Sequence, residues 1–142
     1  MDNIACIVVP NIGIRENNEF SVCFPTKSIL PKTDYCGVFS GHNIDKSNVF
    51  SVQYGKLKNA PIIRECNICF SCKVTEIVPV KSYEVYFGQV VEHFAHPSVL
   101  SNGQIDFDKV KPVIFGPGRA YNSLSSTVGI PENEHLKYKR SV

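Results

Sequence analysis

The hydrophobic positions in the first part of the chain mark two short strands. Residues 4–9 form a continuous apolar run closed by a proline, which predicts a buried strand. Residues 20–24 alternate between apolar and polar side chains and predict a second strand, after a brief helix expected over residues 12–18. Thr26 is placed to cap a further helix. Pro31 costs about 3 kcal/mol in a helix interior, so we expect two short helical pieces there.

The second half of the chain has more regular patterns. Residues 68–75 alternate with period two, and residues 83–94 are rich in β-branched and aromatic side chains, so both predict strands. The intervening residues 79–82 are short enough to connect them as a hairpin. Residues 101–103, Ser-Asn-Gly, predict a turn, and residues 113–115 predict a last short strand before a Gly-Pro-Gly sequence. The pattern predicts a mainly β protein with short helices, closing as a barrel or small sandwich.

Composition and charge narrow the class of protein. The chain has 142 residues, 43% of them hydrophobic, and a formal charge of +2, as in an ordinary globular protein. We find no internal repeat or linker and expect one domain over residues 1–142. The charge is too small and too mixed to indicate nucleic-acid binding, and the basic tail at residues 135–140 is typical of a solvated terminus.

Neither a membrane span nor a secretion signal is expected. No apolar run approaches the roughly 20 residues that a span needs, and the N-terminus lacks the pattern of a signal peptide. We therefore expect a cytoplasmic protein without a membrane partner, in which the six cysteines remain thiols.

The sequence "ECNICFSCK", residues 65–73, has the cysteine spacing of an iron–sulfur ligand run. Side chains in a strand alternate between faces, so we expect Cys66 and Cys72 on one face and Cys69 on the other. Three thiolates would then not converge, and no fourth cysteine follows. We interpret the segment as a core strand and expect no metal cluster.

Two other segments look like binding sites but are better explained as ordinary surface or turn structure. His93 and His96 are three residues apart before a proline, and we expect a surface pair at a strand end. Residues 116–121, Gly-Pro-Gly-Arg-Ala-Tyr, resemble a phosphate cradle, but Pro117 donates no backbone N–H and no helix clearly follows. A turn is the better prediction.

The segment over residues 33–47 has little periodicity and concentrates polar side chains. Asp45 is placed to cap a short helix over residues 46–50, which would leave free N–H groups near the Lys46 ammonium. That arrangement suits an anionic ligand. A structural loop with an exposed lysine explains the same residues equally well, and the residues alone leave both readings open.

This segment resembles a known family. Residues 35–46, Tyr-Cys-Gly-Val-Phe-Ser-Gly-His-Asn-Ile-Asp-Lys, are similar to the C-G-x-x-S-G-[RK]-x-x-D-K motif of flavoredoxins, the flavin reductase-like FMN-binding split barrels. Residues 60–66 and 83–92 also resemble segments of that family, as do residues 102–106 and 111–115, in the same order. The resemblance covers roughly residues 8–129.

The resemblance implies a split β-barrel that forms a homodimer, with FMN near the subunit interface. It implies flavin reduction by NAD(P)H, or electron transfer through bound FMN to a redox partner protein. Lys46 would contact the flavin. The resemblance assigns the supporting positions of the flavin site to Tyr35, Cys36, Gly37, Ser40, Gly41 and Asp45, and Tyr83 stands where many relatives have a histidine.

The chain also departs from the family pattern. It lacks the family's first strands, including one that contacts the flavin, and residues 9–13 lack the basic residue and the threonine that hold the FMN phosphate. Each lost charge-assisted hydrogen bond weakens binding by roughly 1.5–3 kcal/mol. We therefore expect an FMN-binding oxidoreductase or electron-transfer protein of this type. The alternative is a degenerate, non-catalytic split-barrel dimer with weak or no flavin binding, which leaves open whether the chain is an enzyme.

Overall fold

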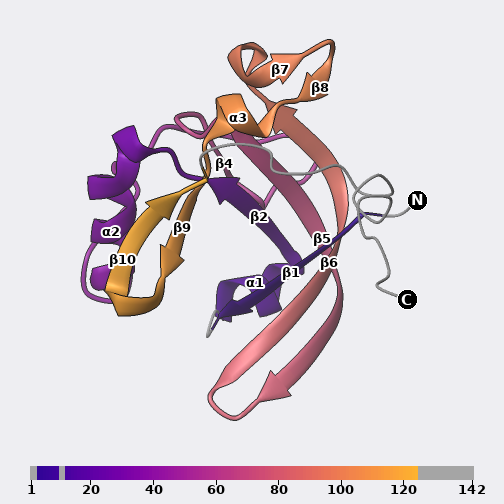
Figure 1. Ribbon diagram of the computed structural model, residues 1–142. Helices are drawn as coiled ribbons and strands as arrows, with labels where there is room; N and C mark the ends of the chain where they lie inside the picture. The colour runs from indigo at the N-terminus through magenta and orange to yellow at the C-terminus, as the bar shows by residue number, and fades with distance from the viewer. Residues whose placement is uncertain (1–2, 10–11, 125–142) are drawn as a thin grey trace, which may run out of the picture.

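A four-stranded antiparallel sheet organises the molecule (Figure 1). The computed structural model describes residues 3–9 and 12–124. The sheet has the strand order β1-β6-β5-β2. Its strands are β1 (Ile4–Val9), β2 (Glu19–Phe24), β5 (Ile68–Val80) and β6 (Tyr83–Ala95). The predicted strands of both halves are thus confirmed.

Short strand pairs and helices surround this sheet. The pairs are β3 (Val52–Gln53) with β4 (Ile62–Ile63), β7 (Leu100–Ser101) with β8 (Gln104–Ile105), and β9 (Val113–Gly116) with β10 (Ala120–Ser123). The helices are α1 (Ile12–Asn17), η1 (Lys27–Ile29), α2 (Leu30–Val38), η2 (Pro97–Val99), α3 (Phe107–Val110) and η3 (Pro117–Arg119). No helix within the described ranges is long and apolar enough to cross a membrane.

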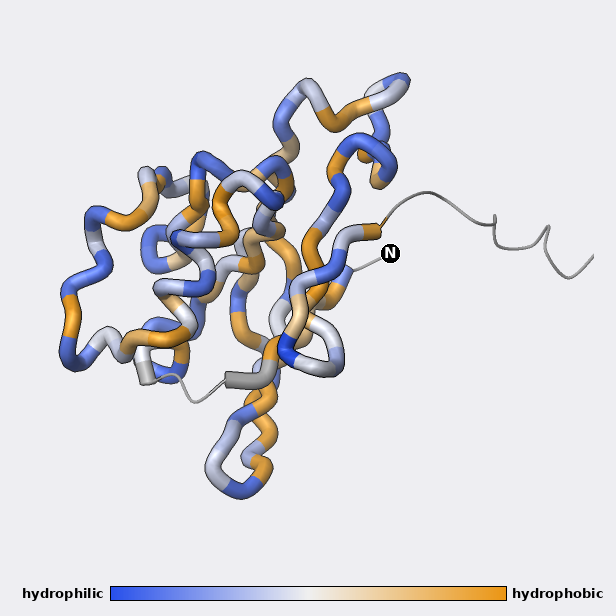
Figure 2. Tube along the Cα trace, turned by 60° about the vertical axis from the view of Figure 1, so that its left-hand side comes forward, coloured by the Kyte–Doolittle hydropathy of each residue, from blue (hydrophilic) through white to orange (hydrophobic). Residues whose placement is uncertain are grey.

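The β5–β6 hairpin is the longest element pair, with 13 residues in each strand. Its tip is hydrophilic and extends away from the rest of the molecule (Figures 1 and 2). The strand register shifts twice, between Ser71 and Cys72 and between Val74 and Glu76. The first shift leaves Val91 of β6 without a paired residue, and the second leaves Thr75 of β5 without one. These β-bulges bend the hairpin where it crosses the core.

Two hydrophobic clusters form the core. The first contains Ile14 of α1, Phe20 of β2, Cys72 of β5 and Tyr86 of β6, so it joins the helix to three strands of the sheet. Ile68, Val99 and Val110 form the second cluster, beneath η2 and α3. Gly88 of β6 faces the first cluster, where a Cβ atom would lie 2.6 Å from Phe20 Cε1.

Turn and helix predictions are largely confirmed. The helical piece after Thr26 is divided into η1 and α2, and Pro31 lies in the first turn of α2, where its missing N–H has no cost. Thr26 occupies the N-cap position of η1, but its hydroxyl bonds the Ser28 hydroxyl and makes no capping hydrogen bond, so the expected side-chain cap is wrong. Asn102 and Gly103 both have positive φ, as the turn between β7 and β8 requires. Residues 116–118 begin a hairpin turn, so the strand at 113–115 is followed by β10 and is not the last.

The prediction that residues 4–9 form a buried strand is wrong in one respect. β1 pairs with β6 alone and forms an edge of the sheet, and Ile4 is 67% exposed. Cys6 is exposed as well. An apolar run can occupy an edge strand as readily as a central one, and the run itself carries no information on its neighbours.

Candidate functional site

A turn places Lys46 beside the C-terminal end of α2. The Asp45 carboxylate accepts from the Ser47 backbone N–H at 2.8 Å and from the Ser47 hydroxyl at 3.0 Å. These two bonds lower the pKa of Asp45, because they favour its ionised form. The Lys46 ammonium donates to the carbonyl oxygen of Cys36 at 2.8 Å. The three residues 36, 45 and 46 of the predicted site are therefore brought together.

The short helix expected over residues 46–50 is absent from the described structure. A hydrogen bond from Val49 N to Lys46 O closes one turn, and Ser51 then pairs with the connection between β4 and β5. Ser51 N donates to the Glu65 carboxylate at 3.1 Å, and Arg64 N donates to Ser51 O at 2.9 Å. These bonds hold the chain in an extended path towards β3, which a continued helix could not follow.

Glu65 also connects this segment to α2. Lys32 Nζ lies 3.6 Å from Glu65 Oε1 and 5.5 Å from the centre of the Phe50 ring. The Ser51 N–H is the main cause that lowers the pKa of Glu65, and the Lys32 charge contributes. Residues 45–51 are thus fixed between α2 and the β4–β5 connection.

Lys46 lies at the wall of a cavity of about 520 Å³. Phe50 and Tyr54 supply aromatic rings, and Ser21 and Ser47 supply hydroxyl groups. The lining is completed by Cys23, Lys46, Val52, Pro61 and Ile63. Ligand pockets typically measure about 300–1,000 Å³ and are mostly apolar with a few polar groups. Apolar and aromatic walls with one ammonium group fit a flat aromatic ring system that carries or gains negative charge, as the isoalloxazine ring of FMN does.

The other predicted site residues lie outside this lining. Ser40 Oγ accepts from His42 N at 3.2 Å, and a Cβ atom at Gly37 or Gly41 would meet nothing within 4 Å. Tyr35 lines a separate depression of about 410 Å³ beside Asn48 and Val49. Tyr83 is at the start of β6, paired with Val80 next to the hairpin tip, and is not among the cavity-lining residues.

Several lining residues were missed by the sequence analysis. Ser21 and Cys23 are two residues apart on β2 and so share a face, a signal that the alternation already contained. Phe50 and Tyr54 lie in a segment without periodicity, and no pattern in the sequence pointed to them.

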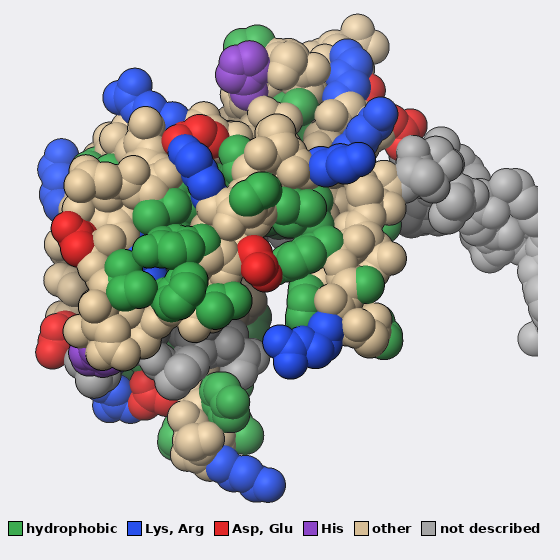
Figure 3. Space-filling view, turned by 90° about the vertical axis from the view of Figure 1, so that its left-hand side faces the viewer, with side chains coloured by type: hydrophobic (Ala, Val, Ile, Leu, Met, Phe, Trp, Pro, Cys, Tyr) green, Lys and Arg blue, Asp and Glu red, His purple; other side chains and the backbone are tan. Residues whose placement is uncertain are grey.

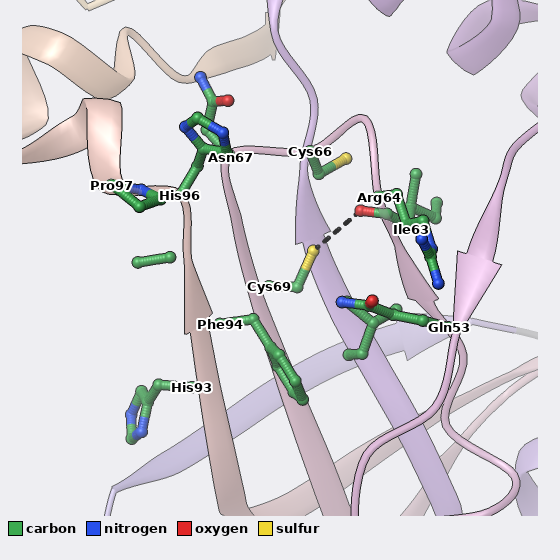
Figure 4. A pocket seen from close by; sticks show the side chains of 12 residues that line it. Gln53, Ile63, Arg64, Cys66, Asn67, Cys69, His93, Phe94, His96 and Pro97 are labelled. Carbon is green, nitrogen blue, oxygen red and sulfur yellow. Dashed lines mark hydrogen bonds between the residues drawn. The ribbon is translucent and has the colours of Figure 1, made fainter.

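A second cavity, of about 370 Å³, lies at the start of β5 (Figure 4). Cys66 and Cys69 line it, and the Cys69 thiol points towards the carbonyl oxygen of Ile63, to which it donates. The expectation that Cys66 shares a face with Cys72 is wrong, because β5 begins only at Ile68 and Cys66 lies in the preceding turn. Cys72 packs in the core cluster instead.

His93 and His96 also line this second cavity. His96 Nδ1 accepts from Ser98 N at 3.2 Å and thereby caps η2. Among the residues that the structure describes, no group of three or more His, Cys, Asp or Glu side chains is arranged to hold a metal ion.

Comparisons with known proteins identify the fold. The chain is 31% identical to a flavoredoxin from Methanosarcina acetivorans, with a TM-score of 0.88 over 94% of this chain and 75% of that one. It is 23% identical to the flavoredoxin of Desulfovibrio vulgaris (Miyazaki F), with a TM-score of 0.80 over 94% of this chain and 80% of that one. These likenesses confirm the predicted split-barrel class.

Sequence comparison agrees with the structural one. An uncharacterized protein from Archaeoglobus fulgidus is 28% identical over 115 residues, and the match covers 78% of this chain. The chain spans 64% of the length of that curated relative. The family model "Flavin reductase like domain" matches residues 13–122. With most of its length matched, the chain belongs to the flavin reductase-like domain family.

Proposed function

We propose that this chain binds FMN in the cavity beside Lys46 and acts as an oxidoreductase or electron-transfer protein of the flavoredoxin type. One observation carries the proposal: a lysine held by the α2 carbonyl of Cys36 lies at the wall of a cavity with aromatic and apolar walls. The family to which the chain belongs supports a flavin-related role. When bound, FMN supplies the hydride and electron chemistry.

The residues of this chain would bind and orient the ring. Phe50 and Tyr54 offer aromatic surfaces for stacking, and the Ser47 hydroxyl lies at the same wall. The Lys46 ammonium would supply positive charge to the bound ring, and such a charge favours the negatively charged reduced form of a flavin. Asp45 and the Cys36 carbonyl hold Lys46 in place through the contacts described above.

The other residues of the motif lie at or just after the C-terminal end of α2, outside the lining of this cavity, and the resemblance alone assigns them to the ligand. Tyr35, Gly37, Ser40 and Gly41 would approach the ligand from the end of α2. Neither glycine has a positive φ or a close neighbour, so the described chain does not itself require glycine there. Close approach of a ligand is one reason for a glycine. Tyr83 is assigned to the flavin site by its resemblance to the family alone. NAD(P)H is the proposed electron donor.

A homodimer and a redox partner protein complete the proposal. Hydrophobic side chains gather on the face that carries α2 (Figure 3). The exposed side chains include Val38, the last residue of α2, Phe39 directly after it, and Phe115 and Tyr121 of the β9–β10 hairpin. Tyr121 OH donates to Asp34 at 2.8 Å and joins the two elements into one face. Contiguous exposed apolar surface of this kind is typical of protein–protein contacts, and sedimentation velocity measures the oligomeric state.

Titration with FMN tests the proposal. The flavin fluorescence of FMN should be quenched on binding, and Lys46→Ala should weaken the affinity about 10- to 150-fold through loss of a charge-assisted contact of about 1.5–3 kcal/mol. Lys109→Ala is the matched control, because Lys109 also donates to a backbone carbonyl, that of Leu100 at 2.8 Å, and does not line the cavity. Equal affinities of the two variants would refute the role of Lys46.

The second candidate is a split-barrel dimer that binds flavin weakly or not at all. It is favoured by one observation, namely that Lys46 is the single cationic residue lining the described cavity, which leaves one charge for both ring and phosphate. A protein that purifies colourless and shows no quenching with micromolar FMN would support this candidate and exclude the first.

A further inference from the structure

Three thiols meet in the wall between the two cavities. Cys23 of β2 lines the larger cavity, Cys66 and Cys69 line the smaller one, and Ile63 lines both. The side chains of Cys66 and Cys69 both interact with the side chain of Cys23. Cys6, Cys36 and Cys72 lie elsewhere, so the described chain gathers half of its six cysteines at one point.

Strand register explains the contact between Cys23 and Cys69. The two residues are directly opposite each other in the β2–β5 ladder. A hydrogen bond from Val74 N to Asn18 O fixes the phase of this ladder. Counted in steps of two residues from that bond, Cys23 and Cys69 form a non-hydrogen-bonded pair, in which Cα atoms approach to about 4.5 Å and the side chains lie close.

The three cysteines differ in freedom and access. Cys69 is 1% exposed, and its thiol donates to the carbonyl oxygen of Ile63 at 3.6 Å. Cys66 lies in the turn before β5 and is half-buried, so its side chain can reorient without breaking the sheet. Cys23 is also half-buried and is the one member of the three that lines the cavity with Lys46.

The pKa values of Cys23 and Cys66 are shifted in opposite directions. Interaction with Cys66, and then with Cys69, lowers the pKa of Cys23, against the opposing effect of burial. The interaction with Cys23 raises the pKa of Cys66. Cys23 is also the member of the three that lines the cavity with Lys46, where a substrate can reach it, and the thiolate is the nucleophilic form of a cysteine.

We propose that Cys23 and Cys66 form a thiol redox centre that reduces small anionic organic disulfides, with Cys23 as the attacking thiolate and Cys66 as the resolving thiol. Cys23 attacks one sulfur of the substrate disulfide, forms a mixed disulfide and releases one substrate thiolate. Cys66 then loses its proton and attacks the Cys23 sulfur, which releases the second thiolate. The two protein thiols are oxidised by two electrons, and the substrate is reduced to two thiols.

The substrate class follows from the cavity. Lys46 is its cationic residue, so a disulfide that carries carboxylate groups is attracted towards Cys23. The distance between Cys66 and the entering disulfide is not critical, because Cys66 attacks the Cys23 sulfur rather than the substrate. This centre does not require bound flavin, and the proposal stands independently of FMN binding.

A single-turnover reaction with 5,5′-dithiobis(2-nitrobenzoate), an anionic aromatic disulfide, tests the proposal. The reduced Cys6→Ser/Cys36→Ser chain is the starting protein, since Cys6 is an exposed thiol on β1 and Cys36 is half-buried, as Cys23 and Cys66 are. We expect two thionitrobenzoate ions to be released for each Cys23–Cys66 pair, and peptide mapping to find a Cys23–Cys66 disulfide. Mapping of the unmutated chain gives the same readout independently of any effect of a substitution on folding.

Three further variants separate the roles. Cys66→Ser should release a single thionitrobenzoate at Cys23 and retain the mixed disulfide there. Cys23→Ser should slow the exchange at residue 66 at least about tenfold, whereas Cys69→Ser should still form the Cys23–Cys66 disulfide. Lys46→Gln should slow the reaction several-fold with the anionic probe but speed it with cystamine, a cationic disulfide that the Lys46 charge repels.

Several results would overturn the proposal. A stable mixed disulfide on Cys23 in the unmutated chain would show that Cys66 does not resolve it. A Cys23–Cys69 disulfide would show that Cys69, and not Cys66, is the resolving thiol. Stoichiometric zinc or iron in the purified protein that is lost in Cys23→Ser would make the cluster a metal site. Equal effects of Lys46→Gln on both probes would remove the preference for anions.

Discussion

Replacement of Gly88 by alanine tests the packing of the main core cluster. The added Cβ atom would lie 2.6 Å from Cε1 and 2.7 Å from Cζ of Phe20, and 3.1 Å from Cβ of Cys72. Carbon atoms in contact prefer separations of about 3.5–4.0 Å, so the Phe20 ring would have to move by about 1 Å. Phe20 is 3% exposed and Cys72 is 0% exposed, which leaves neither side chain room to yield.

We expect Gly88→Ala to lower the free energy of unfolding by about 1–3 kcal/mol, the usual cost of overpacking a core. For a chain of this length, that loss corresponds to a fall in Tm of roughly 2–4 °C for each kcal/mol. Urea denaturation followed by circular dichroism measures it, with the slope m as a check that the cooperative transition is retained.

Gly37→Ala is the matched control for Gly88→Ala. Gly37 lies within α2, has no positive φ, and its added Cβ would meet nothing within 4 Å. Alanine should therefore stabilise the helix by about 0.5–1 kcal/mol. Combining Gly88→Ala with Phe20→Leu should cost less than the sum of the two single changes, since the smaller side chain vacates the space. Unchanged stability of Gly88→Ala would refute this account of the core.

Two other predictions concern the sheet. Ser71 is 0% exposed and its hydroxyl has no hydrogen-bond partner in the described structure, so Ser71→Ala should raise the free energy of unfolding by about 1 kcal/mol in thermal denaturation; a loss of stability would show that a bound molecule satisfies the hydroxyl. Burial raises the pKa of Cys72 from 9.0 to about 11. The unfolded chain therefore ionises first, and stability should fall with pH between about 9 and 11 more steeply in the parent than in Cys72→Ala. Equal slopes in the two denaturation series would contradict that burial effect.

The sequence was informative where a local rule decides the structure. Alternation of side chains predicted β5, β-branched and aromatic residues predicted β6, and a single proline predicted the division of the helical segment after Thr26. The edge position of β1 could not be predicted, because it depends on which strands pair across 75 to 85 residues, from Val9 with Glu84 to Ile4 with Gln89.

The candidate site also contains some residues that a local pattern predicted and others that depend on distant strand pairing. Lys46 was reached through a motif, and its ammonium donates to the Cys36 carbonyl, but its contact with a flavin stays a prediction. The parity argument failed for Cys66, because it assumed a strand that starts two residues earlier than β5 does. The contact between Cys23 and Cys69 depends on the register of two strands far apart in the sequence, and no local pattern encodes a register.

The two bulges of the β5–β6 hairpin have opposite effects that cancel. Ile68 pairs with Ala95 and Val80 pairs with Tyr83, so the partners' residue numbers have the same sum at both ends of the hairpin, 163, although that sum is 162 where Cys72 pairs with Val90. Loss of Thr75 alone, or of Val91 alone, would move the side chains of one part of that strand to the opposite face of the sheet. Loss of both would restore an even ladder. The length of either strand can therefore change only together with that of the other, much as one frameshift is corrected by a second of opposite sign.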